Sequence, residues 1–166
     1  MKKRYVALLR AIAHVSMDSF RDAMEELGFT NVESYGMSGN LLFNAKGSNV
    51  AALEKRITDQ FGTPAMVRTD TQLAKVIAQD PFDSAILFLT RAPTASRRRA
   101  FLKLDFETPR PDLCGKTIYY EHPARLKGKR GSFDFERELN VLGTARSARV
   151  VHQLLARMSN LNKKGK

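Results

Sequence analysis

The sequence predicts an α+β protein of two ferredoxin-like halves, in which helices pack on antiparallel sheets. Hydrophobic residues make up 43% and charged residues 27% of the 166-residue chain, a composition typical of folded proteins rather than disordered ones. Apolar runs of strand length alternate with segments of helical periodicity, and their order in the first half is βαββαβ. A single cysteine excludes an internal disulfide, so an apolar core must stabilise the fold.

The first half has the more regular pattern. Four segments have the length and apolar content of strands, namely residues 5–9, 31–35, 41–43 and 65–68. Ser16 can cap a helix that ends at Gly28, and the apolar residues between them recur at helical spacing. Asn49 can cap a second helix, which Gly62 ends. These elements follow the order of the ferredoxin-like unit.

The second half begins at a soft boundary near residue 80 and is less regular. Its predicted elements are a connecting helix at residues 71–78, strands at 85–89 and 116–120, and a helix at 94–104. Ser132 and Thr144 are expected to cap two final helices, because each precedes a segment of helical periodicity. The expected domains are residues 1–80 and 81–160, followed by a flexible basic tail at residues 161–166.

The start of the chain is basic and then apolar, as in a signal peptide. However, only five apolar residues precede Arg10, whereas a secretory signal needs about 7–15. No run of about 18 apolar residues follows, so the sequence predicts no membrane-spanning helix. We therefore expect a first β-strand here and a cytoplasmic protein.

The charge is unevenly distributed along the chain. The sequence has 28 Lys and Arg residues against 17 Asp and Glu residues, a net charge of +11. Residues 1–90 hold 10 basic and 10 acidic side chains, whereas residues 91–166 hold 18 and 7. Such asymmetry indicates an acidic partner. The alternative is that the charge serves only to keep the protein soluble and monomeric.

Five short motifs are spread along the chain, namely Tyr-Val-Ala-Leu-Leu-Arg at residues 5–10, Leu-Gly-Phe at 27–29, Ser-Gly-Asn at 38–40, Pro-Phe at 81–82 and Thr-Ala-Arg at 144–146. In their order and spacing they resemble the family of domains of unknown function numbered 1697. The resemblance spans residue 5 to about residue 158. It implies an α+β fold of ferredoxin-like halves, but it implies no activity.

The chain departs from this family at two places. Family members usually continue the first strand as Arg-Gly-Ile-Asn-Val-Gly-Gly, whereas here Arg10 is followed by Ala-Ile-Ala-His at residues 11–14. If the family's glycine loop approaches a ligand with its backbone, the missing glycines put that ligand in doubt here. The second departure is Ser147, which stands where the family has Asn.

A basic loop precedes the helix expected at Ser132. Its cations are Arg125, Lys127, Lys129 and Arg130. A phosphate group could bind there, because a helix N-terminus offers free N–H groups and the positive end of a dipole. The loop does not match a phosphate-binding Walker motif, since the required glycine and hydroxyl residue are absent. The alternative is a solvated charged loop.

The last predicted helix places two arginines unfavourably. Arg146 and Arg149 fall in its first turn after Thr144, where a cation opposes the helix dipole at a cost of about 0.3–1 kcal/mol. An anion held by these guanidiniums and by the Thr144 end would offset that cost. Pairing with a nearby Asp or Glu is the alternative. The sequence thus predicts a second anion-binding cluster at Thr144, Arg146 and Arg149.

A third candidate is a cleft formed by Arg10, Ser38 and Asn40. The βαββαβ order places the first and third strands side by side, so the turn at residues 38–40 would lie near Arg10. We favour a purely conformational role for this turn, because Gly and Asn supply the backbone angles of tight turns.

Signs of catalysis are sparse. The three histidines, His14, His122 and His152, have no metal-ligand spacing, and Cys114 is more typical of an incidental thiol than of a nucleophile. We therefore predict no metal and no cofactor, and the sequence assigns no catalytic residue, so whether the protein is an enzyme stays open. Base stacking of the RNA-recognition type is rejected, because residues 39–42 lack the required aromatics.

The sequence as a whole predicts a non-enzymatic protein that binds phosphate-bearing polyanions, most plausibly a nucleic acid backbone, through its basic second half. The main alternative is an enzyme or carrier for a phosphorylated or carboxylated metabolite, with its site between the halves. A third interpretation is an interaction module whose edge strands pair with a partner. The oligomeric state is left open.

Overall fold

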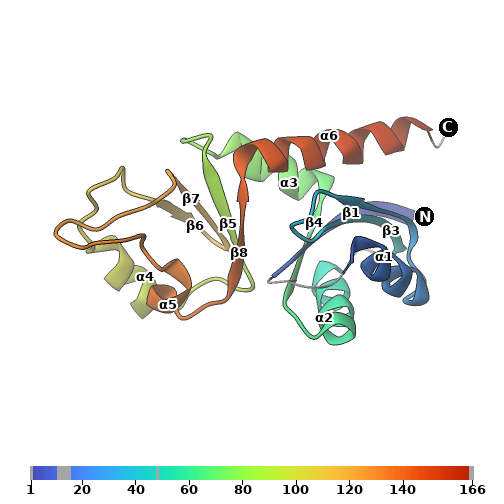
Figure 1. Cartoon of the computed structure of the whole chain (residues 1–166), viewed down its shortest axis with the longest axis horizontal. Coiled ribbons are helices and arrows are strands. Elements are labelled where there is room, and N and C mark those ends of the chain that lie inside the picture. The colour runs from blue at the N-terminus through green and yellow to red at the C-terminus, as the bar shows by residue number, and fades with distance from the viewer. Residues whose placement is uncertain (1, 11–15, 48, 165–166) are drawn as a thin grey trace. The chain divides into compact units, whose positions relative to one another are not determined.

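The computed structural model describes residues 2–10, 16–47 and 49–164, the last five of these by their backbone (Figure 1). The chain divides into two compact units. The first unit comprises Met1–Ala78 and Val150–Lys166, and the second comprises Gln79–Arg149. Each unit contains one four-stranded sheet, and all strand pairs are antiparallel. The α+β fold class predicted from the sequence is therefore confirmed.

The first unit has the predicted βαββαβ order. Its elements are β1 (Lys2–Leu9), α1 (Met17–Glu26), β2 (Thr30–Tyr35), β3 (Asn40–Lys46), α2 (Val50–Phe61) and β4 (Ala65–Thr69), to which α3 (Asp70–Ala78) and α6 (Ala148–Lys164) are added. The strands lie in the order β2-β3-β1-β4, which is the ferredoxin-like arrangement. The predicted helix caps are also confirmed, since Ser16 accepts from the N–H of Ser19 and Asn49 accepts from that of Ala52.

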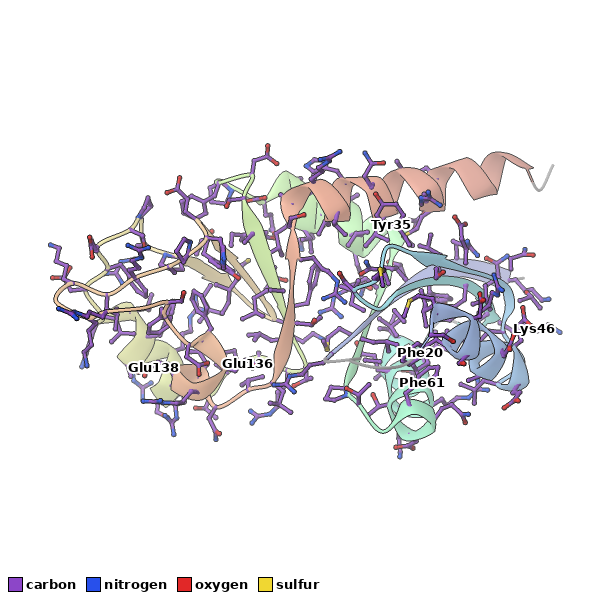
Figure 2. The ribbon with its side chains drawn as sticks, viewed as in Figure 1. Phe20, Tyr35, Lys46, Phe61, Glu136 and Glu138 are labelled. Atoms are coloured by element: carbon purple, nitrogen blue, oxygen red, sulfur yellow. The ribbon has the colours of Figure 1, made fainter. Side chains whose placement is uncertain are left out.

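The core of the first unit is formed by one face of the sheet together with α1 and α2. Alternate residues of β1 point into it, because successive side chains of a strand face opposite sides. Phe20 of α1 and Phe61 of α2 meet in this layer with their ring centroids 4.8 Å apart (Figure 2). Phe43 of β3 is fully buried and stacks on Tyr5, as expected of a core residue.

The second unit repeats the βαββαβ order. Its elements are β5 (Ala85–Leu89), α4 (Ala95–Leu102), β6 (Asp112–Cys114), β7 (Thr117–Tyr120), α5 (Phe135–Leu139) and β8 (Gly143–Ser147). The strand order β6-β7-β5-β8 is equivalent to that of the first unit. Its core contains a cluster of aromatic side chains, in which the ring centroids of Phe133 and Phe135 lie 4.8 Å apart. The prediction of two ferredoxin-like halves is thus confirmed.

Two of the strands in the second unit, β6 and β8, were not predicted from the sequence. The prediction that Thr144 caps the last helix is wrong, because residues 143–147 form β8 and pair with the central strand β5. Gly143 permits this pairing, since a Cβ atom at that position would lie 2.7 Å from the carbonyl oxygen of Phe88. The last helix, α6, begins at Ala148 instead.

The predicted cap at Ser132 is also wrong. Asp134 is the N-cap of α5, and its carboxylate accepts from the N–H of Arg137 at 3.1 Å. The helix is short and ends at Asn140, which adopts a left-handed conformation. Ser132 and Asp134 lie two residues apart, and Ser and Asp are both favoured N-caps, so the sequence alone did not distinguish them.

The position of α6 alters how the basic residues divide between the two units. Residues 150–160 were expected in the second domain, with a flexible tail after them. In the structure, residues from Val150 onwards belong to the first unit, and α6 continues to Lys164. The first unit thus carries 14 basic and 8 acidic side chains, and the second carries 14 and 9. Net charges of +6 and +5 follow, so both units are basic.

Candidate functional site

The basic loop of the second unit is fixed by backbone hydrogen bonds. The N–H of Lys127 donates to the carbonyl of Asp105 at 2.9 Å, and the carbonyl of Arg125 accepts from the N–H of Glu107 at 2.8 Å. At the end of the loop, the N–H of Phe133 donates to the carbonyl of Ala124 at 2.6 Å. Gly128 has a φ of 69°, a left-handed conformation that glycine adopts without strain. The loop therefore presents its side chains from a defined backbone.

All four cations of this loop are exposed. Lys127 pairs with Asp105 at 3.5 Å, and 65% and 72% of these side chains are exposed, so the pair contributes little to stability. No ion pair of Arg125, Lys129 or Arg130 is present among the residues that the structure describes. Three of the four loop cations thus face solvent with their charge uncompensated by a contacting carboxylate.

A pocket of about 310 Å³ lies beside the end of this loop. Its walls include three cations, Lys129, Arg130 and Arg137, and the hydroxyl residue Ser132. Two carboxylates, Asp134 and Glu138, also line it. The carboxylate of Asp134 caps α5, so it points to the N-terminus of that helix. The pocket extends the basic loop towards α5.

Arginines of the second unit bind carbonyl oxygens. Arg97 of α4 donates to the carbonyl of Glu138 at 3.3 Å, and Arg98 donates to that of Leu113 at 3.2 Å. Further contacts of this kind join Arg91 to Asn140 at 3.0 Å and Arg110 to Leu102 and Leu104 at 3.0 and 2.8 Å. These hydrogen bonds hold the arginine side chains in place. Because a carbonyl group has no net charge, they do not neutralise the positive charge of the guanidiniums.

The second predicted cluster is not assembled as a helix start. Thr144 and Arg146 lie on β8, and both are buried. The Nη1 atom of Arg146 donates to the Thr144 hydroxyl at 2.6 Å and to the Ala145 carbonyl at 2.9 Å. Burial lowers the pKa of Arg146 to about 10. Arg149, by contrast, lies on α6 and is exposed. The three residues therefore do not form one exposed cluster.

The third candidate is brought together by the sheet. Asn40 begins β3 opposite Leu8 of β1, and the N–H of Leu9 donates to the carbonyl of Gly39 at 2.9 Å. Asn40 is buried, and its amide donates to the carbonyl of Tyr35 at 3.0 Å, which holds the turn between β2 and β3. Ser38 is exposed, and Arg10 is half-buried. The departure from the family pattern at residues 11–14 lies outside the described residues.

Groups suited to catalysis are scattered in the part of the chain that the structure describes. His122, which follows β7, and His152 on α6 are both exposed, and Cys114 is exposed on β6 with its Sγ atom 3.8 Å from Oε1 of Gln79. His14 lies outside the described residues. No group of three His, Cys, Asp or Glu side chains is arranged to hold a metal in residues 2–10, 16–47 and 49–159.

Comparisons with known proteins identify relatives of the fold. A family model described as a protein of unknown function (DUF1697) matches residues 1–119, well over half of the chain. A conserved bacterial protein, SP0830 from Streptococcus pneumoniae, has a similar structure with a TM-score of 0.66 at 19% identity, over 95% of this chain and 99% of that one. No curated protein matches in sequence. None of the described helices is long and apolar enough to cross a membrane.

Proposed function

The chain belongs to the DUF1697 family of proteins of unknown function, and we propose that it binds the phosphate backbone of nucleic acids through the basic loop of its second unit. The observation that carries this proposal is that Arg125, Lys129 and Arg130 are exposed and that no carboxylate of the described residues pairs with them. Lys and Arg side chains of this kind bind phosphates and release counterions, which drives binding to any sequence.

The proposed surface runs from the loop into the neighbouring pocket. Arg125, Lys129 and Arg130 would contact successive phosphates, and Arg137 would contact a phosphate that enters the pocket. Lys127 would exchange its weak pair with Asp105 for a phosphate contact. The loop backbone is already held by hydrogen bonds, so less conformational entropy is lost on binding.

Two residues of the sequence-derived site take no part in this proposal. Thr144 and Arg146 are at most 9% exposed, so a phosphate backbone could not reach them without opening β8. Arg149 remains a proposed contact because it is exposed. The protein is proposed to act in the cytoplasm, where nucleic acids are available to such a surface.

The aromatics of the first sheet do not favour a base-stacking mode. Tyr5 and Phe43 are both fully buried in the layer that contains α1 and α2. A stacking platform needs exposed rings on which bases can lie. We therefore propose contacts to the backbone alone, without sequence preference.

A salt titration of oligonucleotide binding tests the proposal. The wild-type protein is expected to bind single- and double-stranded oligonucleotides, with an affinity that falls steeply as salt rises. Replacing Arg125, Lys129 and Arg130 by Gln should reduce the slope of log K against log salt by about 2–3, since each phosphate contact contributes about 0.7–0.9. Fluorescence anisotropy at several chloride concentrations measures this slope.

A matched control has the same change in charge elsewhere. Arg21, Lys55 and Lys75 lie on helices of the first unit, and their replacement by Gln should leave most of the slope intact. Equal slopes for the two triple variants would contradict a local site and indicate a general charge effect. Absence of binding at low salt would overturn the proposal altogether.

A further inference from the structure

β4 and β8 occupy equivalent edges of the two sheets. The strand orders are β2-β3-β1-β4 and β6-β7-β5-β8, so each is the last strand of its sheet. Their registers against β1 and β5 also correspond, which makes Ala65 equivalent to Gly143 and Arg68 equivalent to Arg146. An edge strand presents a row of N–H and C=O groups with which another chain can pair. The groups that occupy this row therefore decide whether the two edges are open.

Side chains occupy the outer N–H groups of β4. In an antiparallel pair, alternate residues direct their N–H groups to the same side of the strand. Those of three alternate residues donate to side chains of α2 and α3, namely Ala65 to Oγ1 of Thr58 at 3.1 Å, Val67 to Oε1 of Glu54 at 3.1 Å and Thr69 to Oε1 of Gln72 at 2.9 Å. These N–H groups point away from β1 and already have acceptors.

Arg68 completes the cap at the middle of β4. Its Nη1 atom donates to the carbonyl of Val67 at 2.8 Å and to Oε1 of Glu54 at 3.2 Å. The side chains of Arg68 and Glu54 are 7% and 19% exposed, so the pair is largely removed from water. Such a pair often adds little stability, because the cost of desolvating two charges offsets their attraction. Here it occupies both backbone groups of Val67.

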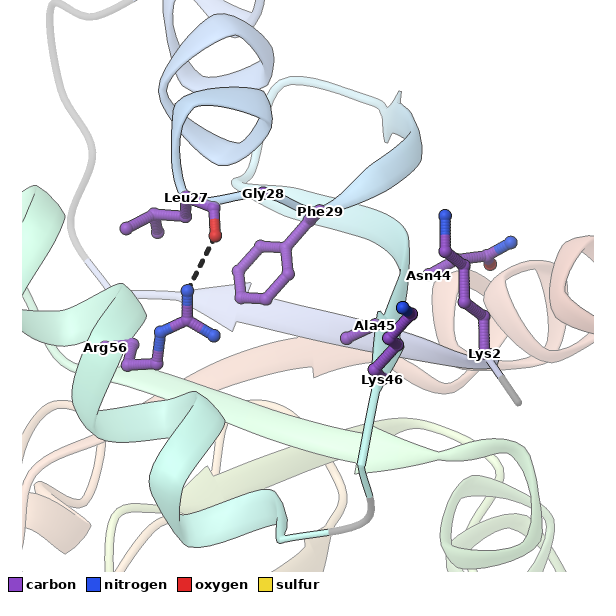
Figure 3. A pocket seen from close by; sticks show the side chains of 8 residues that line it. All are labelled: Lys2, Leu27, Gly28, Phe29, Asn44, Ala45, Lys46 and Arg56. Atoms are coloured by element: carbon purple, nitrogen blue, oxygen red, sulfur yellow. Dashed lines mark hydrogen bonds between the residues drawn. The ribbon is translucent and has the colours of Figure 1, made fainter.

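The helix that supplies two of these acceptors is itself held in place. Glu54 and Thr58 are four residues apart, so they lie on the same face of α2. Arg56 contacts a different element, because its Nη2 atom donates to the carbonyl of Leu27 at 2.6 Å (Figure 3). Its guanidinium also lies 4.9 Å from the ring centroid of Phe29. α2 therefore presents Glu54 and Thr58 to β4 from a fixed position.

β8 repeats this arrangement in the second unit. The N–H of Gly143 donates to Oε1 of Glu136 at 2.7 Å, and Nη1 of Arg146 donates to the carbonyl of the preceding residue at 2.9 Å. In both units the acceptor for the first N–H of the strand lies seven residues earlier, on the preceding helix. It is Thr58 for Ala65 and Glu136 for Gly143. The acceptor group differs, but its position and the arginine are the same.

We propose that these side chains block the pairing of β4 and β8 with a further strand, and that the strand excluded at β4 is β4 of a second copy of the chain. The sequence of β4, Ala-Met-Val-Arg-Thr, is mostly apolar and suits a paired strand. Two copies can pair antiparallel about a two-fold axis through Val67, which sets Met66 opposite Arg68. The cap at Val67 prevents this. The inference goes beyond the proposed function and does not depend on it.

A double variant removes the cap without leaving a buried charge unpaired. Glu54→Leu with Arg68→Met replaces the pair by apolar side chains, which is often neutral or stabilising. Sedimentation of the full chain over a wide range of concentrations measures the mass. The wild type should stay a monomer, whereas the mass of the double variant should approach twice that of the chain. A folded double variant that stays a monomer at every concentration, or a wild type that dimerises equally, would overturn the proposal.

A control variant removes another ion pair from the same helix. Lys55→Gln with Asp59→Asn breaks an exposed pair of α2, and it leaves the net charge unchanged, as the first double variant does. It should remain a monomer. Dimerisation of both double variants would show that association does not depend on the cap.

A second variant and a second measurement locate the interface. Glu54→Ala with Arg68→Thr removes the same cap with shorter side chains, and it replaces the first variant if that one does not fold. Urea unfolding shows which of them is folded. In the dimer, the N–H of Val67 should exchange with solvent more slowly than in the dilute monomer of the same variant, because it pairs with the second copy. A dimer in which the Val67 amide exchanges as fast as in the monomer would place the interface elsewhere and contradict the proposal.

Discussion

Arg157 on α6 donates a hydrogen bond to the carboxylate of Glu33 on β2, although 124 residues separate them in the sequence. The guanidinium also lies 4.5 Å from the ring centroid of Tyr35 on the same strand. Glu33 has a second partner, because Nη2 of the buried Arg4 lies 3.5 Å from its other oxygen. One carboxylate thus joins α6 to the sheet of the first unit and neutralises a guanidinium within it.

Replacing Glu33 should therefore destabilise the protein more than replacing Arg157. Arg157 is 43% exposed, so Arg157→Gln should lower the free energy of unfolding by about 1 kcal/mol, as expected for an exposed pair and a cation–π contact. Glu33→Gln leaves the buried Arg4 without its carboxylate and should lower it by about 2 kcal/mol. This is below the effect of breaking a fully buried pair, because Glu33 is one-third exposed.

Urea unfolding of both variants measures this difference. Lys55→Gln, which breaks an exposed pair with Asp59, is the control and should leave the free energy of unfolding nearly unchanged. A larger loss for Arg157→Gln than for Glu33→Gln would contradict the shared role of the carboxylate.

Two buried tyrosines should respond oppositely to removal of the hydroxyl group. The Tyr119 hydroxyl is buried and has no hydrogen-bond partner among the described residues. Tyr119→Phe should therefore raise the free energy of unfolding by about 1 kcal/mol, because an unsatisfied polar group no longer has to be desolvated. Tyr5→Phe should lower it by a similar amount, since the Tyr5 hydroxyl donates to the Gly47 carbonyl at 2.6 Å. Thermal and urea unfolding measure both changes. A change of the same sign in the two variants would contradict this explanation.

Tyr119 should also make the protein less stable at high pH. Burial, followed by the nearby Cys114, Asp80 and Asp112 charges, raises the pKa of Tyr119 from its ordinary value of 10.0 to about 12. Between these values the unfolded chain loses the phenol proton while the folded protein keeps it. Stability from this group is thus present below pH 10 and falls as the pH rises towards 12. Between pH 10 and 12, the urea midpoint should fall less steeply for Tyr119→Phe than for the wild type. If the midpoints of both proteins fell equally with pH, other groups would cause the loss of stability.

The first unit could be predicted from the sequence because its local signals agree with its tertiary structure. Ser16 and Asn49 cap helices as expected, and Gly62 ends α2 with a left-handed φ of 67°. The second unit has the same topology, but two of its strands carry weak signals. β6 is three residues long, and β8 contains a glycine and a buried arginine. Pairing with neighbouring strands determines these elements, and pairing is not a local property.

The candidate site was predictable only in part for the same reason. The basic loop was identifiable from its composition, and its four cations are exposed in the structure. The cluster at Thr144 was misplaced because the residues that pair with β8 lie in β5, more than fifty residues earlier.

Gly143→Ala should destabilise the second unit. A Cβ atom there would lie 2.7 Å from the backbone oxygen of Phe88 and 3.1 Å from side chains of Leu87 and Leu89, so the central strand β5 would have to move. We expect a loss of about 1–3 kcal/mol, which is typical of overpacking. Ala145→Ser, at an exposed position of the same strand, is the control and should have little effect. Wild-type stability of Gly143→Ala in urea would show that β8 does not approach β5 as closely as described.

Arg146→Gln separates the structural arginine of β8 from the proposed binding surface. Arg146 is 6% exposed, and it donates to the Thr144 hydroxyl and the Ala145 carbonyl. Its replacement should lower the free energy of unfolding by about 1–3 kcal/mol, because hydrogen bonds to a charged group are lost. The salt slope of oligonucleotide binding should stay at the wild-type value, since a buried guanidinium contacts no phosphate. A slope reduced by about 1 in a folded Arg146→Gln variant would place Arg146 in the nucleic acid contact, and it would require β8 to open on binding.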